Sequence, residues 1–250
     1  MPKMDKLLVF LHKLGSPKSF YAWSGRALPW FVIIGGILFA YGLFAGLVLA
    51  PPDYQQGDAL RIIYVHVPAA FMSLFIYSMI ATCALIHLVW RVKLMDVMMQ
   101  VSAPIGAWMT FLALFTGAIW GKPMWGIWWI WDARLTSELI LLFLYLGLIA
   151  LRQAIIEPQQ ASRAVAMLAL IGFVNIPIIH YSVYWWNTLH QGATIAKFAQ
   201  PSIANDMLYP LLAMMMAFFC YFIGLMMMRA RSEVLWRERR TRWIRKLIRD

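Results

Sequence analysis

The sequence predicts an all-α integral membrane protein: one polytopic domain over residues 1–250, with six transmembrane helices and both termini in the cytoplasm. Three observations support this prediction. The chain is 62% hydrophobic and 13% charged, with a mean hydropathy of +0.69, which excludes an ordinary soluble domain. Six apolar runs are long enough to cross roughly 30 Å of hydrocarbon. Basic residues are concentrated in alternate connections between these runs.

We expect the helices at about residues 28–50, 67–89, 101–120, 135–151, 164–184 and 208–228. An open strand edge in lipid would leave backbone polar groups unsatisfied, so each run should be helical. The first run is longer than the apolar part of a signal peptide and indicates a retained anchor. Short connections at residues 91–100 and 152–163 alternate with longer ones at 51–66, 121–134 and 185–207. No run shows a broken helix, and Cys83 and Cys220 are too isolated for dithiol chemistry.

The basic residues orient these helices. On this topology 18 of the 22 lysines and arginines lie on the side of the two tails, and four lie opposite: Arg61, Lys122, Arg134 and Lys197. The positive-inside rule therefore places both termini in the cytoplasm and residues 120–134, between the third and fourth helices, outside. The net charge of +11 is thus a signal of membrane orientation, and no nucleic-acid partner is expected. The basic tail after Met228 fits an anchor near lipid headgroups, although a partner is the alternative.

A tryptophan-rich segment, residues 120–134, is the most unusual feature. Five of the 13 tryptophans fall within it, followed by Asp132 and Arg134: Trp120, Trp125, Trp128, Trp129 and Trp131. A bilayer boundary needs one or two such rings per helix end, so five predict a platform for a planar ligand. If the segment is helical from Trp125, then Trp125, Trp129 and Asp132 share one face. A simple interfacial anchor is the alternative.

Two histidines lie on the same outer side as this segment. His66 precedes the second helix and His190 lies in the third outer connection. A lone histidine in a loop is usually just solvated, but two beside an aromatic platform can hold a haem iron axially. Arg61 and Arg134 are candidates for the haem propionates, because arginine binds carboxylates in bidentate fashion. Glu138 is expected to cap the first turn of the fourth helix.

The segments Tyr64–Ala70, Trp120–Asp132 and Trp185–Gly192 resemble the WWD-domain haem-handling proteins of cytochrome c maturation, in particular the CcmC family. The resemblance covers nearly the whole chain. It implies transient binding of haem b at the periplasmic face of a bacterial inner membrane, with His66 and His190 as axial ligands. It further implies delivery of haem to the chaperone CcmE, within a complex of CcmA, CcmB and CcmD. No Walker A motif is present, so the chain is expected to be a carrier rather than an enzyme.

Three other functions remain possible from the sequence. A haem lyase or synthase component would share the WWD segment but is larger and carries further histidines within its helices. A membrane cytochrome would need ligands at depth, where only His87 and His180 are candidates, near opposite membrane faces. A haem exporter subunit would need a route across the bilayer, for which broken helices and buried polar tracks are the usual sign.

Overall fold

The computed structural model describes residues 15–186, 188–190 and 203–249. These residues form helices and connecting turns, with no β-strand among them. Six stretches are helical, long and apolar enough to cross a membrane: Pro17–Leu49, Asp58–Trp90, Lys93–Trp125, Ala133–Ala154, Pro158–Trp185 and Asn205–Glu238. The predicted fold class, a multi-pass helical membrane protein, is therefore confirmed.

The first half of the chain supplies three long helices. They are α2 (Pro17–Phe44), α3 (Ile63–Trp90) and α4 (Lys93–Trp125). α2 continues into the π-helical turn η1 (Ala45–Leu49), and the short 3-10 helix η2 (Asp58–Ile62) leads into α3. The second half supplies α5 (Ala133–Ala154), α6 (Pro158–Gly172), α7 (Asn175–Trp185), α8 (Asn205–Glu238) and the short α9 (Arg242–Arg249). Most of these helices extend beyond the predicted bounds, because hydropathy marks the part in lipid while the helices continue into the headgroup region.

The fifth span contains a break that the sequence analysis did not predict. α6 ends at Gly172 and α7 begins at Asn175. Pro177 contributes to the break, because it lies two residues after the start of α7 and has no N–H to continue the hydrogen bonds of α6. The break is packed against its neighbours: the Asn175 side chain donates to the Ser137 carbonyl at 2.9 Å, and a Cβ on Gly172 would meet the Tyr77 hydroxyl.

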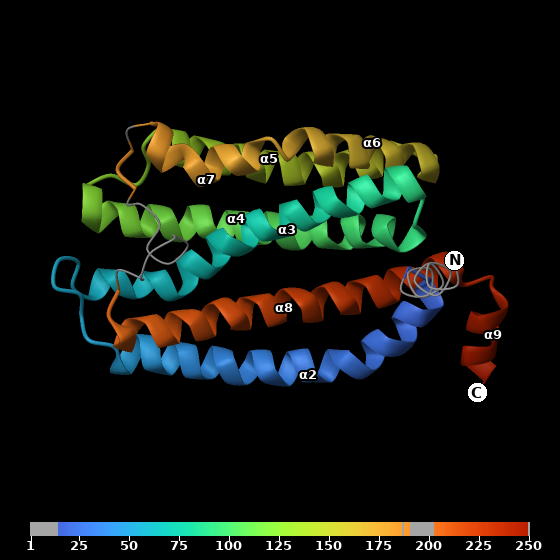
Figure 1. Cartoon of the computed structure of the whole chain (residues 1–250), viewed down its shortest axis with the longest axis horizontal. Helices are drawn as coiled ribbons and strands as arrows, with labels where there is room; N and C mark the ends of the chain where they lie inside the picture. Colours follow the sequence, from blue (N-terminus) through green and yellow to red (C-terminus); the bar gives the residue numbers. More distant parts are fainter. Residues whose placement is uncertain (1–14, 187, 191–202, 250) are drawn as a thin grey trace, which may run out of the picture.

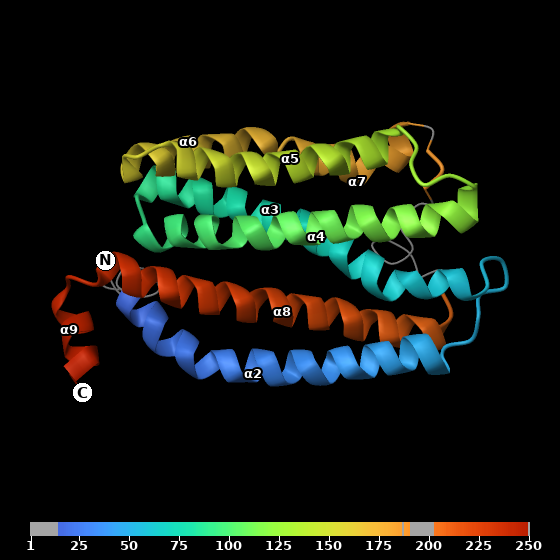
Figure 2. The same cartoon turned by 180° about the vertical axis from the view of Figure 1, so that it is seen from behind.

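The helices form three layers (Figures 1 and 2). α2 packs along α8, α3 packs along α4, and α5 lies beside α6 and α7 on the far side of the α3–α4 layer. The buried core runs through the middle layer, and its largest fully buried side chains include Tyr64, Tyr77 and Tyr145. The middle layer therefore contacts both outer layers, and it carries His66 at one end of α3.

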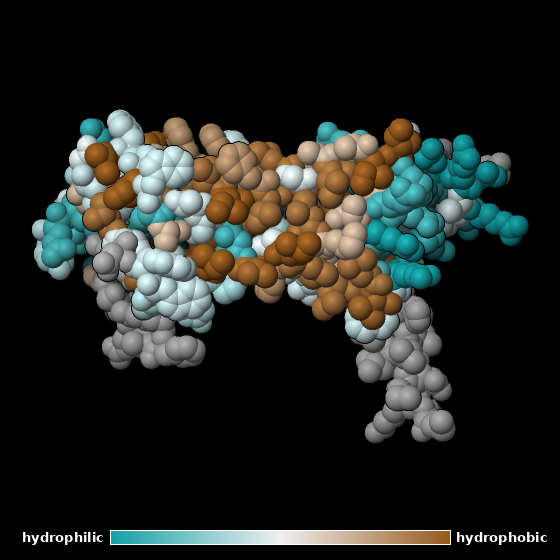
Figure 3. Space-filling view, turned by 90° about the horizontal axis from the view of Figure 1, so that it is seen from above, coloured by the Kyte–Doolittle hydropathy of each residue, from teal (hydrophilic) through white to brown (hydrophobic). Residues whose placement is uncertain are grey.

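The two ends of the bundle differ in character. Figure 3 shows an apolar band around the middle and hydrophilic residues at both ends, with the larger hydrophilic area at the end of the α3–α4 turn. The start of α2 and all of α9 lie at that same end, whereas the end of α4 and the start of α5 lie at the other (Figure 1). The tryptophan-rich segment and most of the basic residues thus lie at opposite ends of the apolar band.

Glu138 does not cap its helix as predicted. Asp132 is the N-cap of α5, and its Oδ1 accepts from the Leu135 N–H at 2.8 Å. Glu138 lies beyond the first turn and is buried, where Ser73 of α3 donates to its carboxyl oxygen at 2.7 Å. A buried carboxyl group needs a hydrogen-bond partner, and here Ser73 supplies it. The hydrogen bond thereby connects α5 to α3 inside the span. The prediction failed because the Ser73 contact joins residues far apart in the sequence.

Candidate functional site

The tryptophan-rich segment is mostly not helical. α4 ends at Trp125, and Gly126 follows with a φ of +76°, a left-handed conformation that glycine adopts without strain. The Gly126 N–H donates to the Lys122 carbonyl, and Lys122 Nζ donates to the Gly126 carbonyl, so both groups close the helix end. Residues 127–132 then run without regular structure until Asp132 starts α5. The segment is therefore not helical from Trp125, so the condition for Trp125, Trp129 and Asp132 to share a helix face is not met.

The five tryptophans fall into two groups by exposure. Trp120 and Trp125 belong to α4 and are partly buried, and each contacts a histidine ring. Trp128 and Trp131 lie in the irregular part and are 59% and 74% exposed. Trp129 packs edge-on against Trp131, and its buried Nε1–H has no acceptor among the described residues. A buried N–H without an acceptor is uncommon and fits a donor that meets its acceptor on a ligand.

His66 lies on the first turn of α3 and is held against α4. Its Nδ1 is 3.0 Å from the Thr116 hydroxyl oxygen, and that hydroxyl donates to the Leu112 carbonyl at 2.6 Å. Because the hydroxyl proton is used on Leu112, the oxygen accepts from the Nδ1–H of His66. The Nε2 atom therefore keeps its lone pair. Trp120 packs edge-on against the ring, with centroids 5.6 Å apart, and Gly117 makes room for it, since a Cβ there would lie 3.0 Å from Cε1.

His190 is held by the same type of contact on the other side of the tryptophan segment. Its Nδ1 is 3.1 Å from Asp132 Oδ2, and Trp125 packs edge-on with ring centroids 4.9 Å apart. A carboxylate accepts a proton from Nδ1 and leaves the Nε2 lone pair available, as in many metal-binding histidines. Burial lowers the pKa of His190 below its ordinary value, against the opposing effect of Asp132. The ring is therefore neutral at neutral pH, which is the form that binds iron.

The two predicted arginines have different surroundings. Arg61 is engaged, because its Nε meets Asp58 at 2.8 Å and its Nη1 donates to the Gly46 carbonyl at 2.9 Å. Arg134 donates to the Ile179 carbonyl at 3.1 Å. Arg134 lies two residues after Asp132, the partner of His190, and its charge adds to the effect of burial in lowering the pKa of His190. Arg134 is thus a cation on the side of His190.

His87 and His180 lie away from this site. His87 is in the last turn of α3, where its Nε2 is 2.7 Å from the Ser162 hydroxyl. His180 is exposed on α7 and packs against Tyr181. Neither shares a contact with His66 or His190 among the described residues. The structure thus separates the histidines as the topology of the sequence predicted.

Two residues of the site were missed by the sequence analysis. Thr116 fixes the tautomer of His66, and Gln56 accepts from the Trp120 indole N–H at 2.9 Å. Gln56 sits in a tight turn, where its backbone N–H and that of Gln55 donate to the Asp53 carboxylate. The spacing of Thr116 one helical turn before Trp120 was the available signal, because residues four apart share a helix face.

Asp132→Asn should disable His190 as a ligand while leaving α5 intact. Asparagine is an equally good N-cap, so its Oδ1 would still accept from Leu135. Its amide Nδ2 would then face His190 Nδ1, and two donors cannot pair. The imidazole proton would move to Nε2, which removes the free lone pair. We expect affinity for haem to fall roughly 10–100-fold, the usual effect of losing such a support.

The measurement is a haem titration of the purified Asp132→Asn protein, followed by absorption. Loss of the negative charge would lower the pKa of His190 further, so a lower affinity for haem could not result from protonation of His190. Asp58→Asn is the matched control, since Asp58 is an exposed carboxylate whose one ion pair among the described residues is with Arg61. An Asp132→Asn protein with wild-type affinity would show that the Asp132 contact does not set the tautomer.

Comparison with known proteins identifies the family. The family model of "Heme exporter protein C" (CcmC) matches residues 10–245. The proteins named "Heme exporter protein C" from Escherichia coli K12 and Haemophilus influenzae are 50% and 47% identical, over 95% of this chain and 96% and 97% of their own lengths. The Bradyrhizobium diazoefficiens protein of the same name is 48% identical over 91% of this chain and 86% of its own. From the helical fold, the tryptophan-rich segment and these similarities, the chain belongs to the CcmC family.

Proposed function

We propose that this protein binds haem at the periplasmic face of the inner membrane and passes it to the chaperone CcmE during cytochrome c maturation. One observation carries the proposal: His66 and His190 come from separate elements at one end of the bundle, and each has Nδ1 hydrogen-bonded and Nε2 available. Neutral imidazole Nε2 is a common axial ligand of haem iron. The names of the relatives mention haem as well.

The other side chains of the site fit a porphyrin. Two indoles flank the histidine rings, and the Trp129 N–H lacks an acceptor. Arg134 can contribute a cation to a propionate. Trp128 and Trp131 are the exposed part of the platform. In this proposal haem b is cargo that is bound only in transit, so a platform with exposed rings suits transfer better than an enclosed pocket would.

The proposal extends to orientation and partners. The hydrophilic end with α9 would face the cytoplasm, because it holds most of the basic residues. The tryptophan end would face the periplasm, where the chaperone CcmE can reach it. CcmA, CcmB and CcmD would be partners within the membrane complex. The chain itself would act as a carrier, and it would not hydrolyse ATP, since its sequence has no Walker A motif.

Export of haem across the bilayer is the second candidate, and the break between α6 and α7 favours it. Broken helices mark binding sites in many transporters. Here the break is filled by the Tyr77 side chain and by the Asn175 bond to Ser137. The break is therefore packed with side chains, although the buried Tyr77 hydroxyl beside it has no hydrogen-bond partner among the described residues. Delivery of haem from the tryptophan end agrees better than export does with the position of the His66 and His190 Nε2 atoms, which lie at that end of the bundle.

Accessibility of single cysteines tests the orientation. In a chain whose own two cysteines, both buried, are changed to serine, a cysteine replacing the exposed Lys122 should react with an impermeant maleimide in intact cells. A cysteine at the exposed Arg240 should react only after the membrane is opened. The reason is the positive-inside rule. Labelling of Lys122→Cys only after lysis would reverse the orientation and place the site in the cytoplasm.

The transfer itself can be tested with purified components. Haem-loaded protein in nanodiscs is mixed with the soluble domain of apo-CcmE, and haem is followed from one protein to the other by absorption. Haem should leave the carrier only when the chaperone is present. Apomyoglobin serves as a nonspecific acceptor. Equal rates of loss to both acceptors would contradict directed delivery.

A further inference from the structure

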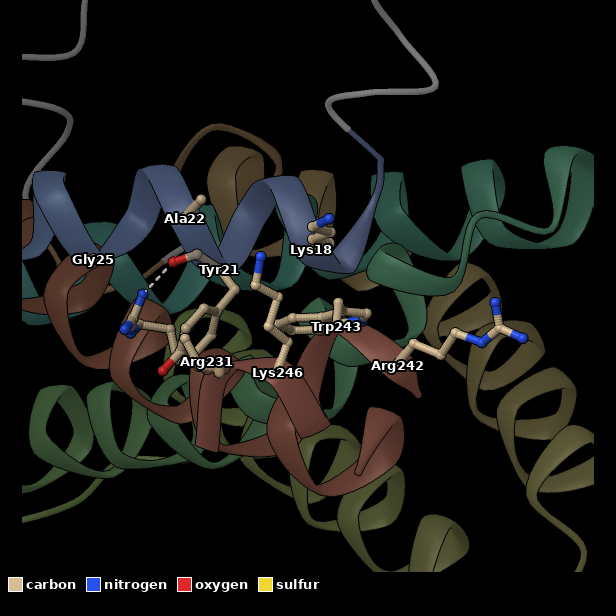
Figure 4. A pocket seen from close by; sticks show the side chains of 9 residues that line it. Lys18, Tyr21, Ala22, Gly25, Arg231, Arg242, Trp243 and Lys246 are labelled. Carbon is tan, nitrogen blue, oxygen red and sulfur yellow. Dashed lines mark hydrogen bonds between the residues drawn. The ribbon is translucent and has the colours of Figure 1, made fainter. Parts of the chain in front are cut away.

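A pocket of about 600 Å³ lies at the basic end of the bundle, at the opposite end from His66 and His190. It forms where the first turns of α2 meet the last part of α8 and the short helix α9 (Figure 4). Four of its lining residues are basic and none is acidic: Lys18, Arg231, Arg242 and Lys246. The pocket thus gathers positive charge at the place where the bundle leaves the apolar band.

Arg231 is fixed at the base of this pocket. Its guanidinium stacks on the Tyr21 ring, 3.9 Å from the centroid, and Nη1 donates to the Tyr21 carbonyl and to the Ser24 hydroxyl. A Cβ on Gly25 would lie 2.6 Å from Nη1, so this glycine makes room for the group. Its Nη2 meets no acceptor among the described residues. An arginine whose guanidinium is fixed by these contacts offers an anion a charged N–H donor in a defined position.

Two lysines reach the same space from different helices. Lys18 comes from the first turn of α2 and Lys246 from α9, and both are exposed. Figure 4 shows Lys246 extending from α9 toward α2, between Tyr21 and Lys18, while Arg242 extends outward. No carboxylate of the described residues pairs with either lysine. Like charges that converge in this way repel unless an anion lies between them.

The rest of the lining is apolar and aromatic. Trp243 and Tyr21 form one wall, with ring centroids 5.8 Å apart, and Leu247 continues it. The Trp243 indole N–H is bonded to Glu238, which fixes the ring and leaves its apolar face toward the pocket. α9 itself is amphipathic, since Ile244 is buried while Arg242 and Lys246 are exposed. Such a helix lies in the plane of a membrane interface.

We propose that this pocket binds the phosphate of one anionic phospholipid from the leaflet on the basic side, with Arg231, Lys18 and Lys246 around the phosphate. The apolar wall of Tyr21, Trp243 and Leu247 distinguishes a lipid from a free phosphate, because it can cover the glycerol and the first methylenes of the acyl chains. The lipid would join α9 to the ends of α2 and α8. The proposal rests on the membrane fold and is independent of the proposed haem function.

Native mass spectrometry of the purified full chain tests the site. Phosphatidylglycerol and phosphatidylcholine with identical acyl chains are titrated into protein in a neutral detergent, and bound lipids are counted. The test variant is Lys18→Gln/Lys246→Gln. The matched control is Arg229→Gln/Arg240→Gln, which removes the same charge from exposed positions outside the pocket. Circular dichroism checks that all proteins keep their helices.

The wild-type protein and the control should bind one phosphatidylglycerol in preference to phosphatidylcholine. The test variant should bind it about 25-fold more weakly, since each basic side chain beside an anionic headgroup strengthens binding about fivefold. Equal losses in the test and control variants would overturn the proposal in favour of diffuse attraction by the basic tail. Displacement of the lipid by millimolar inorganic phosphate would indicate a free-phosphate site. A poly-glutamate peptide that competes at micromolar concentration would indicate an acidic protein partner instead.

Discussion

His66→Ala and His190→Ala should each lower haem retention by roughly a hundredfold or more, because each removes one axial Nε2 atom. Both variants should fold. In His66→Ala the Thr116 hydroxyl still donates to Leu112, and in His190→Ala Asp132 still caps α5. The measurement is haem content per protein, together with the absorption spectrum after purification from cells that supply haem.

Free imidazole should partly restore haem to either variant, because it can enter the vacated axial position. His180→Ala is the matched control, since its ring is exposed on α7 and contacts neither ligand. Its haem content should equal that of the unmodified protein. If both single variants keep normal haem content and an unchanged spectrum, neither histidine is a ligand, and the tryptophans would have to hold haem alone.

Trp128→Ala/Trp131→Ala should retain haem ligation but load the chaperone roughly 5–150-fold less. These rings are exposed and contact neither histidine, so the axial ligands remain in place. Each aromatic stacking contact is worth about 0.5–1.5 kcal/mol, so two contacts to the porphyrin or the chaperone account for such a loss. Covalent haem on CcmE in cells, at matched expression, is the measurement.

The matched control for this pair is Trp90→Ala/Trp236→Ala. Both rings are exposed to a similar extent, 67% and 63%, and belong to the opposite ends of α3 and α8 from the site. Replacing Trp125, Trp129 and Asp132 together with Trp128 should abolish loading entirely, since Asp132 also holds His190. Normal loading by the Trp128/Trp131 variant would mean that these two rings serve only as a membrane anchor.

The sequence predicted the spans well because hydropathy depends on composition within one segment. The predicted spans at residues 28–50 and 208–228 are apolar, and the structure has helices over all of their residues except Ala50. The positions at which helices end or break were harder to predict, since each depends on a single residue. Gly126 stops α4 and Pro177 contributes to the break in the fifth span, and both residues were visible in the sequence. Their effect was missed because the hydrophobic pattern continues through them.

The sequence indicated which residues form the candidate site, but it did not indicate which side chains contact one another. His66 and His190 stood out because they flank the tryptophan segment. Thr116 is 50 residues from His66, and Asp132 is 58 residues from His190, so local periodicity could not pair them. Glu138 was given a capping role for the same reason, since its partner Ser73 is 65 residues away. Side-chain pairing across helices depends on packing, which one sequence does not display.

The central claim is that the Nε2 atoms of His66 and His190 hold one haem. It is tested most directly by pulsed electron–nuclear double resonance on the haem-loaded ferric protein, labelled with 15N-histidine. Two strongly coupled histidine nitrogens are expected, of which His66→Ala removes one and His190→Ala the other. A haem-loaded protein with no more than one coupled histidine nitrogen, or with two that persist in both variants, would contradict the claim.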